Sequence, residues 1–108
     1  MSTGEVVILV TAPTREEAQR IAQLLLERRK AACVNIVPMV DSVFWWQGRL
    51  DSGQEVLLIV KTRAALVSQV VQLVRQVHSY TTPEVIALPI ISGNEEYLTW
   101  IQAETRND

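Results

Sequence analysis

The chain begins with two segments whose hydrophobic patterns have different periods. Residues 5–12 are mostly apolar on both faces, which is typical of a central strand covered on both sides, and Pro13 ends them. From Thr14 onward, apolar residues recur with the spacing i, i+3, i+4, i+7, which predicts an amphipathic helix. The residues of this stripe are Ala18, Ile21, Ala22 and Leu25. Thr14 is the expected N-cap, and Glu17, three residues later, completes a capping box.

The middle of the chain predicts a long hairpin. Residues 31–47 form an extended pattern, in which Pro38 should produce a bulge or a kink because proline lacks a backbone donor. Residues 47–53 contain Gly, Asp and Ser and predict a turn, and residues 55–62 predict the returning strand. We therefore expect two antiparallel strands joined by that turn.

The last third of the chain predicts helix, strand and helix. Residues 64–79 predict a second helix, residues 84–91 a strand, and Asn94 the cap of a short final helix. The expected buried stripe of the second helix consists of Val67, Val70, Val71, Val74 and Val77. The expected inner face of the final helix consists of Tyr97, Leu98 and Ile101.

The elements follow the order strand, helix, strand, strand, helix, strand, with an extra C-terminal helix. This is the order of a ferredoxin-like α+β sandwich, βαββαβ, in which both long helices cover one face of a four-stranded antiparallel sheet. A chain of 108 residues has room for one core, so we expect residues 1–108 to be a single domain.

An aromatic segment predicts contact with another copy of the chain. Phe44, Trp45 and Trp46 make their strand apolar on both faces, which a single layer of helices cannot cover. Two tryptophan rings bury about 400 Å² together, which corresponds to about 10 kcal/mol gross. We therefore expect these three residues to lie in a subunit interface, although the pattern alone gives no number of subunits.

Composition and charge exclude several classes of partner. Hydrophobic residues make up 48% of the chain and charged residues 20%, as in globular proteins, and the net charge of −2 argues against nucleic acid. No apolar run approaches the roughly 18 residues of a membrane helix, and no Lys or Arg precedes Arg15, so we expect neither a membrane span nor a secretory signal. The single cysteine, Cys33, cannot form an internal disulfide, so the expected compartment is the reducing cytoplasm.

Two residues are candidate metal ligands. His78 is the only histidine and lies on a polar loop before the last strand, and its imidazole suits copper or zinc. Cys33 offers a thiol that suits Cu(I). Both have structural alternatives, because cysteine often packs as a small apolar group and a histidine at a helix end interacts with the helix dipole.

Several ordered motifs resemble the CutA family of divalent-cation tolerance proteins, over about residues 6–103. The motifs are Ala31-Ala32-Cys33-Val34-Asn35-Ile36, Trp45-Trp46-Gln47-Gly48, the loop His78-Ser79-Tyr80-Thr81-Thr82-Pro83-Glu84 with the strand that follows it, and Tyr97-Leu98-Thr99-Trp100. The resemblance implies a compact homotrimer in which the long hairpins reach neighbouring subunits. It also implies tolerance of copper and other divalent metals.

The chain departs from the metal pattern of that family. Val10 and Val77 stand where some members carry a cysteine and a second histidine. One His and one Cys per chain cannot make a closed four-ligand site. The expectation is therefore weak, exchangeable binding of copper or another divalent metal through His78, with no organic cofactor.

The resemblance further implies a ligand cleft between subunits, lined by Lys61, Tyr80 and Glu84. The family is similar in fold and trimeric state to PII signalling proteins, so the alternative function is a sensor or scaffold that binds a small anion or a protein partner. The structural alternative is that Lys61 pairs with Glu84 while the Tyr80 hydroxyl caps a backbone group. The glycines are isolated and no nucleophile has an evident base, so we expect no enzyme.

Overall fold

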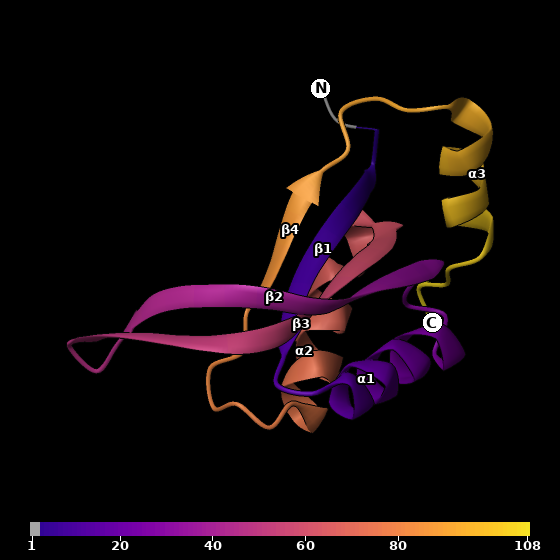
Figure 1. The fold of residues 1–108 in the computed structure, drawn as a ribbon. Coiled ribbons are helices and arrows are strands. Elements are labelled where there is room, and N and C mark those ends of the chain that lie inside the picture. The colour runs from indigo at the N-terminus through magenta and orange to yellow at the C-terminus, as the bar shows by residue number, and fades with distance from the viewer. Residues whose placement is uncertain (1–2) are drawn as a thin grey trace.

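The computed structural model describes residues 3–108, and its elements follow the expected order (Figure 1). The strands are β1 (Glu5–Ala12), β2 (Cys33–Trp46), β3 (Arg49–Arg63) and β4 (Val85–Pro89). The helices are α1 (Arg15–Glu27), α2 (Val67–Val77) and α3 (Glu95–Ala103), and a 3-10 turn, η1 (Ala64–Leu66), leads into α2. The sheet order is β2-β3-β1-β4 with antiparallel neighbours, which confirms the prediction of a ferredoxin-like α+β fold.

The hydrophobic core lies between the sheet and the two long helices. Successive side chains of a strand point to opposite faces, and alternate residues of β1 and β3 are buried against α1 and α2. The buried core residues of these four elements are Val6, Ile8, Val10, Ala12, Ala18, Ile21, Ala22, Leu25, Val56, Leu58, Val60, Val70 and Val74. The predicted stripe of α1 is thus buried throughout.

The third helix covers one end of the opposite face of the sheet. Gln102 of α3 donates a hydrogen bond to the carboxylate of Glu5 in β1. Just beyond the helix, Thr105 Oγ1 accepts a hydrogen bond of 2.7 Å from Nε of Arg63 in β3. Glu5 and Arg63 pair across the sheet and belong to the face that α1 and α2 do not cover. The rest of that face, which we call the open face, has no cover among residues 3–108.

The hairpin of β2 and β3 extends far beyond the rest of the sheet (Figure 1). Its register shifts between Val37 and Val40, which confirms the bulge predicted at Pro38. Since β2 is an edge strand, the missing N–H of proline leaves no ladder bond broken in the sheet centre. The turn itself is short: Gln47 and Gly48 have φ angles of 51° and 78°, as in the two-residue turns that match the twist of a hairpin.

Two predictions about element boundaries are wrong. β3 begins at Arg49, because residues 49–54 pair with β2, for example Asp51 with Phe44, and do not form a broad turn. Cross-strand pairing therefore outweighs the turn preference of Asp, Ser and Gly in this segment. Val77 is exposed, not buried, because α2 ends there and His78 takes the buried position.

Candidate functional site

His78 is buried at the end of α2, and both of its ring nitrogens have partners. Nε2 lies 2.7 Å from the carbonyl oxygen of Thr11 in β1, and the backbone N–H of Tyr80 donates to Nδ1 at 3.0 Å. A carbonyl can only accept, so Nε2 carries the proton, and Nδ1 uses its lone pair for Tyr80. This arrangement is that of a neutral imidazole whose side chain is 0% exposed. No lone pair of His78 is free for a metal in this arrangement.

Glu17 reaches the same loop from α1. One carboxylate oxygen, Oε2, accepts hydrogen bonds from the backbone N–H of Ser79 at 2.9 Å and from its hydroxyl at 3.0 Å, and lies 3.3 Å from Nδ1 of His78. Burial raises the pKa of the Glu17 carboxyl, but the two hydrogen bonds from Ser79 and the positive charge of Arg20 lower it more, so the net pKa is below its ordinary value.

The predicted capping box of α1 is therefore only half formed. Thr14 Oγ1 accepts from the backbone N–H of Glu17 at 3.1 Å, as expected of an N-cap. The Glu17 side chain turns away from the helix terminus and binds the loop after α2 instead.

Tyr80 connects the loop to the base of the hairpin. Its hydroxyl donates to Oε2 of Glu55 in β3 at 2.9 Å, and its ring lies 4.8 Å from the His78 ring, centroid to centroid. Burial, the hydrogen bond to Glu55 and the charge of that carboxylate raise the pKa of Tyr80 to about 12. The alternative in which the hydroxyl caps a backbone group is thus not what the structure has.

Within one chain, Lys61 is far from Tyr80 and Glu84. Lys61 and Glu55, the partner of Tyr80, are six residues apart along β3, which corresponds to about 20 Å. Glu84 precedes Val85, which pairs with Val10, whereas Lys61 pairs with Val7 at the other end of β1. The three expected cleft residues therefore do not meet within a single chain.

Lys61 does not form the ion pair with Glu84 that was considered as the structural alternative. Its ammonium group donates to Oδ1 of Asn35 on the neighbouring strand β2, and among residues 3–108 no ion pair joins it to Glu84. Glu84 is exposed at the start of β4. Asn35 was not a predicted site residue, and nothing in its local pattern distinguishes it from any polar residue of an edge strand.

Cys33 lies on the open face, toward the other end of the sheet from His78. It is a free, half-buried thiol that pairs with Lys61 across the sheet. Burial raises the pKa of Tyr97 in α3, and the neighbouring Cys33 thiol contributes to that shift. Across the sheet, Cys33 is level with Val7 of β1. Thr11, whose carbonyl binds His78, is four residues further along that strand, which corresponds to about 13 Å. No group of three or more His, Cys, Asp or Glu side chains within residues 3–108 could hold a metal ion. The donors of one chain thus do not fit a metal site.

The aromatic residues of the hairpin are exposed in the single chain. Trp45 is 71% exposed, Trp46 51% and Phe44 39%. Phe44 and Trp46 follow Val40 on the side of β2 that continues the open face, whereas Trp45 lies on the other side. Both sides of the hairpin are thus apolar and uncovered, as the sequence predicted.

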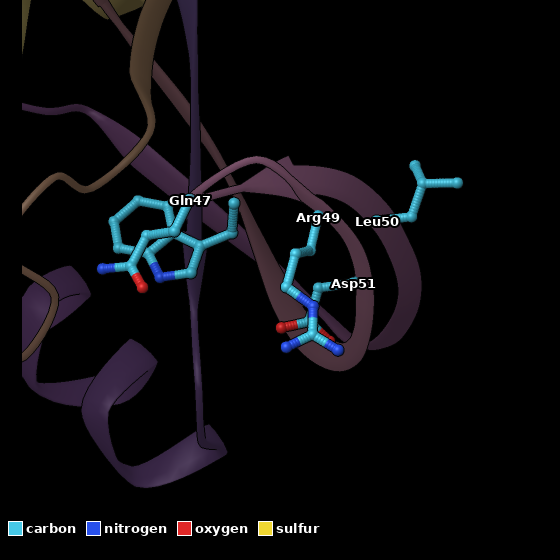
Figure 2. Close-up of a pocket in the computed structure, with 5 residues that line it drawn as sticks. Gln47, Arg49, Leu50 and Asp51 are labelled. Carbon is cyan, nitrogen blue, oxygen red and sulfur yellow. The ribbon is translucent and has the colours of Figure 1, made fainter.

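Two of the shallow hollows on the described residues show what the surface offers. One lies at the hairpin tip and is lined by Trp46, Gln47, Arg49, Leu50 and Asp51. Figure 2 shows Arg49 and Asp51 on one side of the tip and Leu50 pointing away from them, as strand alternation requires. The other hollow lies at the start of α3 and is lined by Glu95, Glu96 and Thr99. Neither hollow contains a residue of the expected ligand cleft.

Sequence reasoning missed Glu17 and Glu55 as partners of the loop. One signal could have identified Glu17: it precedes Ile21 by four residues, so it falls on the buried stripe of α1. A carboxylate on a buried stripe needs a polar partner from elsewhere in the fold. For Glu55 we find no comparable signal, because it lies on a half-exposed strand.

The fold defines a class: this is a ferredoxin-like α+β protein with a long protruding hairpin, and the loop after α2 is bonded to the base of that hairpin. A family model described as CutA1 divalent ion tolerance protein matches residues 6–104. The chain belongs to the CutA1 divalent ion tolerance family. No helix among residues 3–108 is both long and apolar enough to cross a membrane.

Individual relatives agree with this assignment. The chain is 48% identical to the divalent-cation tolerance protein CutA of Thermus thermophilus, over 94% of this chain and 98% of the relative. It is 46% identical to "Protein CutA 1, chloroplastic" of Oryza sativa, over 94% of this chain but 57% of the relative. The chain thus spans little more than half the length of that plant relative.

Solved structures give the same result. The Cut A1 structure from Thermus thermophilus superposes with a TM-score of 0.92 at 47% identity, covering 94% of this chain and 99% of that one. CutA1 from Oryza sativa gives a TM-score of 0.94 at 43% identity, covering 99% of this chain and 98% of that one. The names of the family model and of the Thermus thermophilus relative describe tolerance of divalent ions.

Proposed function

We propose that this chain acts as a homotrimer that contributes to divalent-cation tolerance and binds its ligands in clefts between subunits. The observation that carries the proposal is the open face, where Ile86 and Leu88 are 51% and 47% exposed. This face continues onto the exposed Phe44 and Trp46 of the hairpin. Continuous apolar surface of this kind is usually buried against a partner. The number three rests on the resemblance to the CutA family described above.

The separation of Lys61 from Tyr80 and Glu84 supports clefts between subunits. In one chain, Lys61 lies toward one end of the open face, and Tyr80 and Glu84 lie toward the other. A neighbouring subunit that packs on this face can place its own Lys61 next to Tyr80 and Glu84 of the first subunit. The cleft in this proposal is therefore built by two chains.

Metal binding in this proposal is weak and exchangeable. The donors of one described chain form no cluster, so a site needs ligands from different subunits or a His78 released from the Tyr80 amide. Copper is the metal we propose, because imidazole and thiol are the ligands that it prefers among those present.

The assembly is tested by light scattering on a sizing column. We expect three times the chain mass of 12.2 kDa at low micromolar concentration. Trp46→Ala should weaken the trimer more than Trp45→Ala, although Trp45 is the more exposed, because Trp46 lies on the side that continues the open face. A wild-type monomer would contradict the proposal, and equal effects of the two variants would contradict the assignment of the interface side.

Metal binding is tested by calorimetric titration with Cu(II). We expect modest affinity that falls at pH 5, because protons compete for imidazole, and that is lost in His78→Ala but kept in Cys33→Ser. Circular dichroism of His78→Ala checks that the variant remains folded. Wild-type affinity in His78→Ala would remove His78 as the ligand, and no binding at millimolar Cu(II) would remove copper from the proposal.

A second candidate function is the binding of a small anion in the same cleft. The observation that favours it is Lys61, which within residues 3–108 contacts the neutral Asn35 amide and no carboxylate. A thermal-shift screen with nucleotides and carboxylates should then show stabilisation that Lys61→Met removes and the exposed-surface control Arg28→Met retains. No shift with any anion would contradict this candidate.

The cytoplasm is the compartment that we propose. The unpaired thiol of Cys33 supports it, since free cysteines persist in reducing compartments. Relatives carry the words chloroplastic and periplasmic in their names, so the compartment differs between them. Cell fractionation of the tagged protein would test this proposal, and recovery outside the cytoplasm would contradict it.

A further inference from the structure

Three consecutive residues after α2 are held by three different elements of the fold. The His78 ring donates to the Thr11 carbonyl of β1, Ser79 donates twice to Glu17 of α1, and the Tyr80 hydroxyl donates to Glu55 of β3. A loop is normally the most mobile part of a chain. This one is fixed on all sides because each of its first three residues has its own partner.

Glu17 differs from the other two partners in its chemistry. It is a charged group that is 6% exposed. Its Oε2 atom accepts from the backbone N–H and the hydroxyl of Ser79 and lies 3.3 Å from Nδ1 of His78. Hydrogen bonds to a charged acceptor are stronger than those to neutral groups. Thr14 caps the backbone N–H of Glu17, but the Glu17 carboxylate bonds Ser79 instead of the Thr14 N–H that a capping box would use.

We propose that Glu17 is the positioning residue of the loop 78–84: its carboxylate fixes Ser79 to α1 and thereby sets the direction in which Tyr80 is presented at the subunit cleft. The inference rests on the proposed function in one respect, because the loop matters as the carrier of Tyr80 and Glu84. Its structural part concerns the free chain and holds without any ligand.

The neighbouring Glu16 provides a matched control. Both glutamates lie in the first turn of α1, so both interact with the helix dipole to a similar extent. Glu16 is exposed and has no partner in the loop, whereas Glu17 is buried against it. An effect of the helix dipole alone would appear in both substitutions, and an effect of positioning only in the substitution of Glu17.

The test is amide hydrogen exchange of the ligand-free protein, read residue by residue by NMR. In Glu17→Ala we expect protection at Ser79 and Tyr80 to fall about tenfold or more, since a hydrogen bond to a charged group is lost. Core amides such as those of Ile8 and Val60 should keep their protection. Glu17→Gln should lose less than the alanine variant, because its side-chain oxygen still accepts from Ser79, and Glu16→Ala should behave as wild type.

Several outcomes would overturn the proposal. Unchanged exchange at Ser79 and Tyr80 in Glu17→Ala removes the positioning role, and so does an equal loss in Glu16→Ala. A uniform loss that includes Ile8 and Val60 would make Glu17 a residue of general stability. If Glu17→Ala does not fold, Glu17→Gln decides: a loss of about threefold confined to the two loop amides supports the proposal, and wild-type exchange refutes it.

The result is separate from the outcome of the ligand tests. Exchange is measured without metal or anion, so a cleft that binds neither leaves a confirmed positioning role intact. Conversely, wild-type exchange in the Glu17 variants would remove the positioning role even in a protein that binds Cu(II) or an anion through the cleft.

Discussion

The two faces of the sheet are made by the same strands but differ in how they are completed. On the helix face, Ile8, Leu58 and Val60 are fully buried by α1 and α2. On the open face, their neighbours in sequence are half-buried, and Ile86 and Leu88 of β4 are about half exposed. The comparison teaches that the helices of the chain complete the core on one face of the sheet, whereas the other face keeps an apolar surface that residues 3–108 leave partly exposed.

The hairpin extends this difference beyond the body of the sheet. From Val56 onward the strand β3 packs on the helices, but residues 49–54 have neither helix nor core beneath them and are exposed. Two strands alone are marginally stable in water. In the proposed assembly, the hairpin is therefore the part of the chain that gains most stability from a neighbouring subunit.

The largest expected effect compares two neighbouring residues on opposite faces. Leu58→Ala should lower the free energy of unfolding by about 3 kcal/mol at any protein concentration, because it leaves a cavity in the packed core. Ile59→Ala, on the open face, should lower the free energy of unfolding by less than Leu58→Ala in dilute protein. The loss should grow at higher protein concentration, where the oligomer forms. Urea unfolding at several protein concentrations measures both.

The concentration dependence is the decisive control. If Ile59→Ala loses the same free energy at every concentration, the open face is not a subunit interface. A Leu58→Ala variant with wild-type stability would contradict the assignment of the core.

A smaller effect concerns the bond that ties the loop to the hairpin base. The folded-state pKa of Tyr80, about 12, lies above its ordinary value of 10, so the neutral hydroxyl stabilises the fold. That contribution is fully present below pH 10 and is lost as the pH rises through about 12. Tyr80→Phe should therefore be less stable than wild type near neutral pH, by up to about 1 kcal/mol, with the difference shrinking above pH 10.

Thermal melts between pH 7 and pH 11.5 measure this difference. Tyr97→Phe is the comparison for the Glu55 bond: the pKa of Tyr97 is also raised, so its pH dependence should have the same sign, but the hydrogen bond to Glu55 belongs to Tyr80. A gap between wild type and Tyr80→Phe that stays constant with pH would show that Tyr80 does not titrate as the geometry requires.

The smallest expected effect is at the hairpin tip. Gln47 adopts a φ of 51°, a left-handed conformation that asparagine tolerates better than glutamine, and Gly48 follows it. Gln47→Asn should thus stabilise the hairpin by about 0.5 kcal/mol. Amide exchange near the tip should slow while core amides remain unchanged. Gln54→Asn, at an exposed position in β3, is the control, and a gain there of equal size would contradict the turn argument.

Much of the fold could be predicted because each element has its own local signal. The period-3.6 pattern of α1, Thr14 as a cap and Pro38 as a bulge were each correct. The predicted turn over residues 47–53 failed because turn-forming residues were paired into β3 by a partner strand. Local propensity is a weak signal wherever a neighbouring strand supplies hydrogen bonds.

The candidate site was predicted less well than the fold. Sequence reasoning selected His78, Tyr80 and Lys61, but it did not predict that His78 is buried with both nitrogens engaged or that Tyr80 binds Glu55. These contacts join residues 67 and 25 positions apart in the chain. No local pattern contains that information.

The sequence by itself determined the order of the elements, the buried stripe of α1, and an apolar hairpin with too much surface for one chain. These follow from periodicity and composition, which act over a few residues. Only the tertiary structure decided that Glu17 leaves its helix terminus to hold the loop, and that Lys61 lies a sheet's length from Tyr80. The physical reason is that a polar group takes its partner from whatever the fold brings within about 3 Å, and that choice is made after the chain has packed.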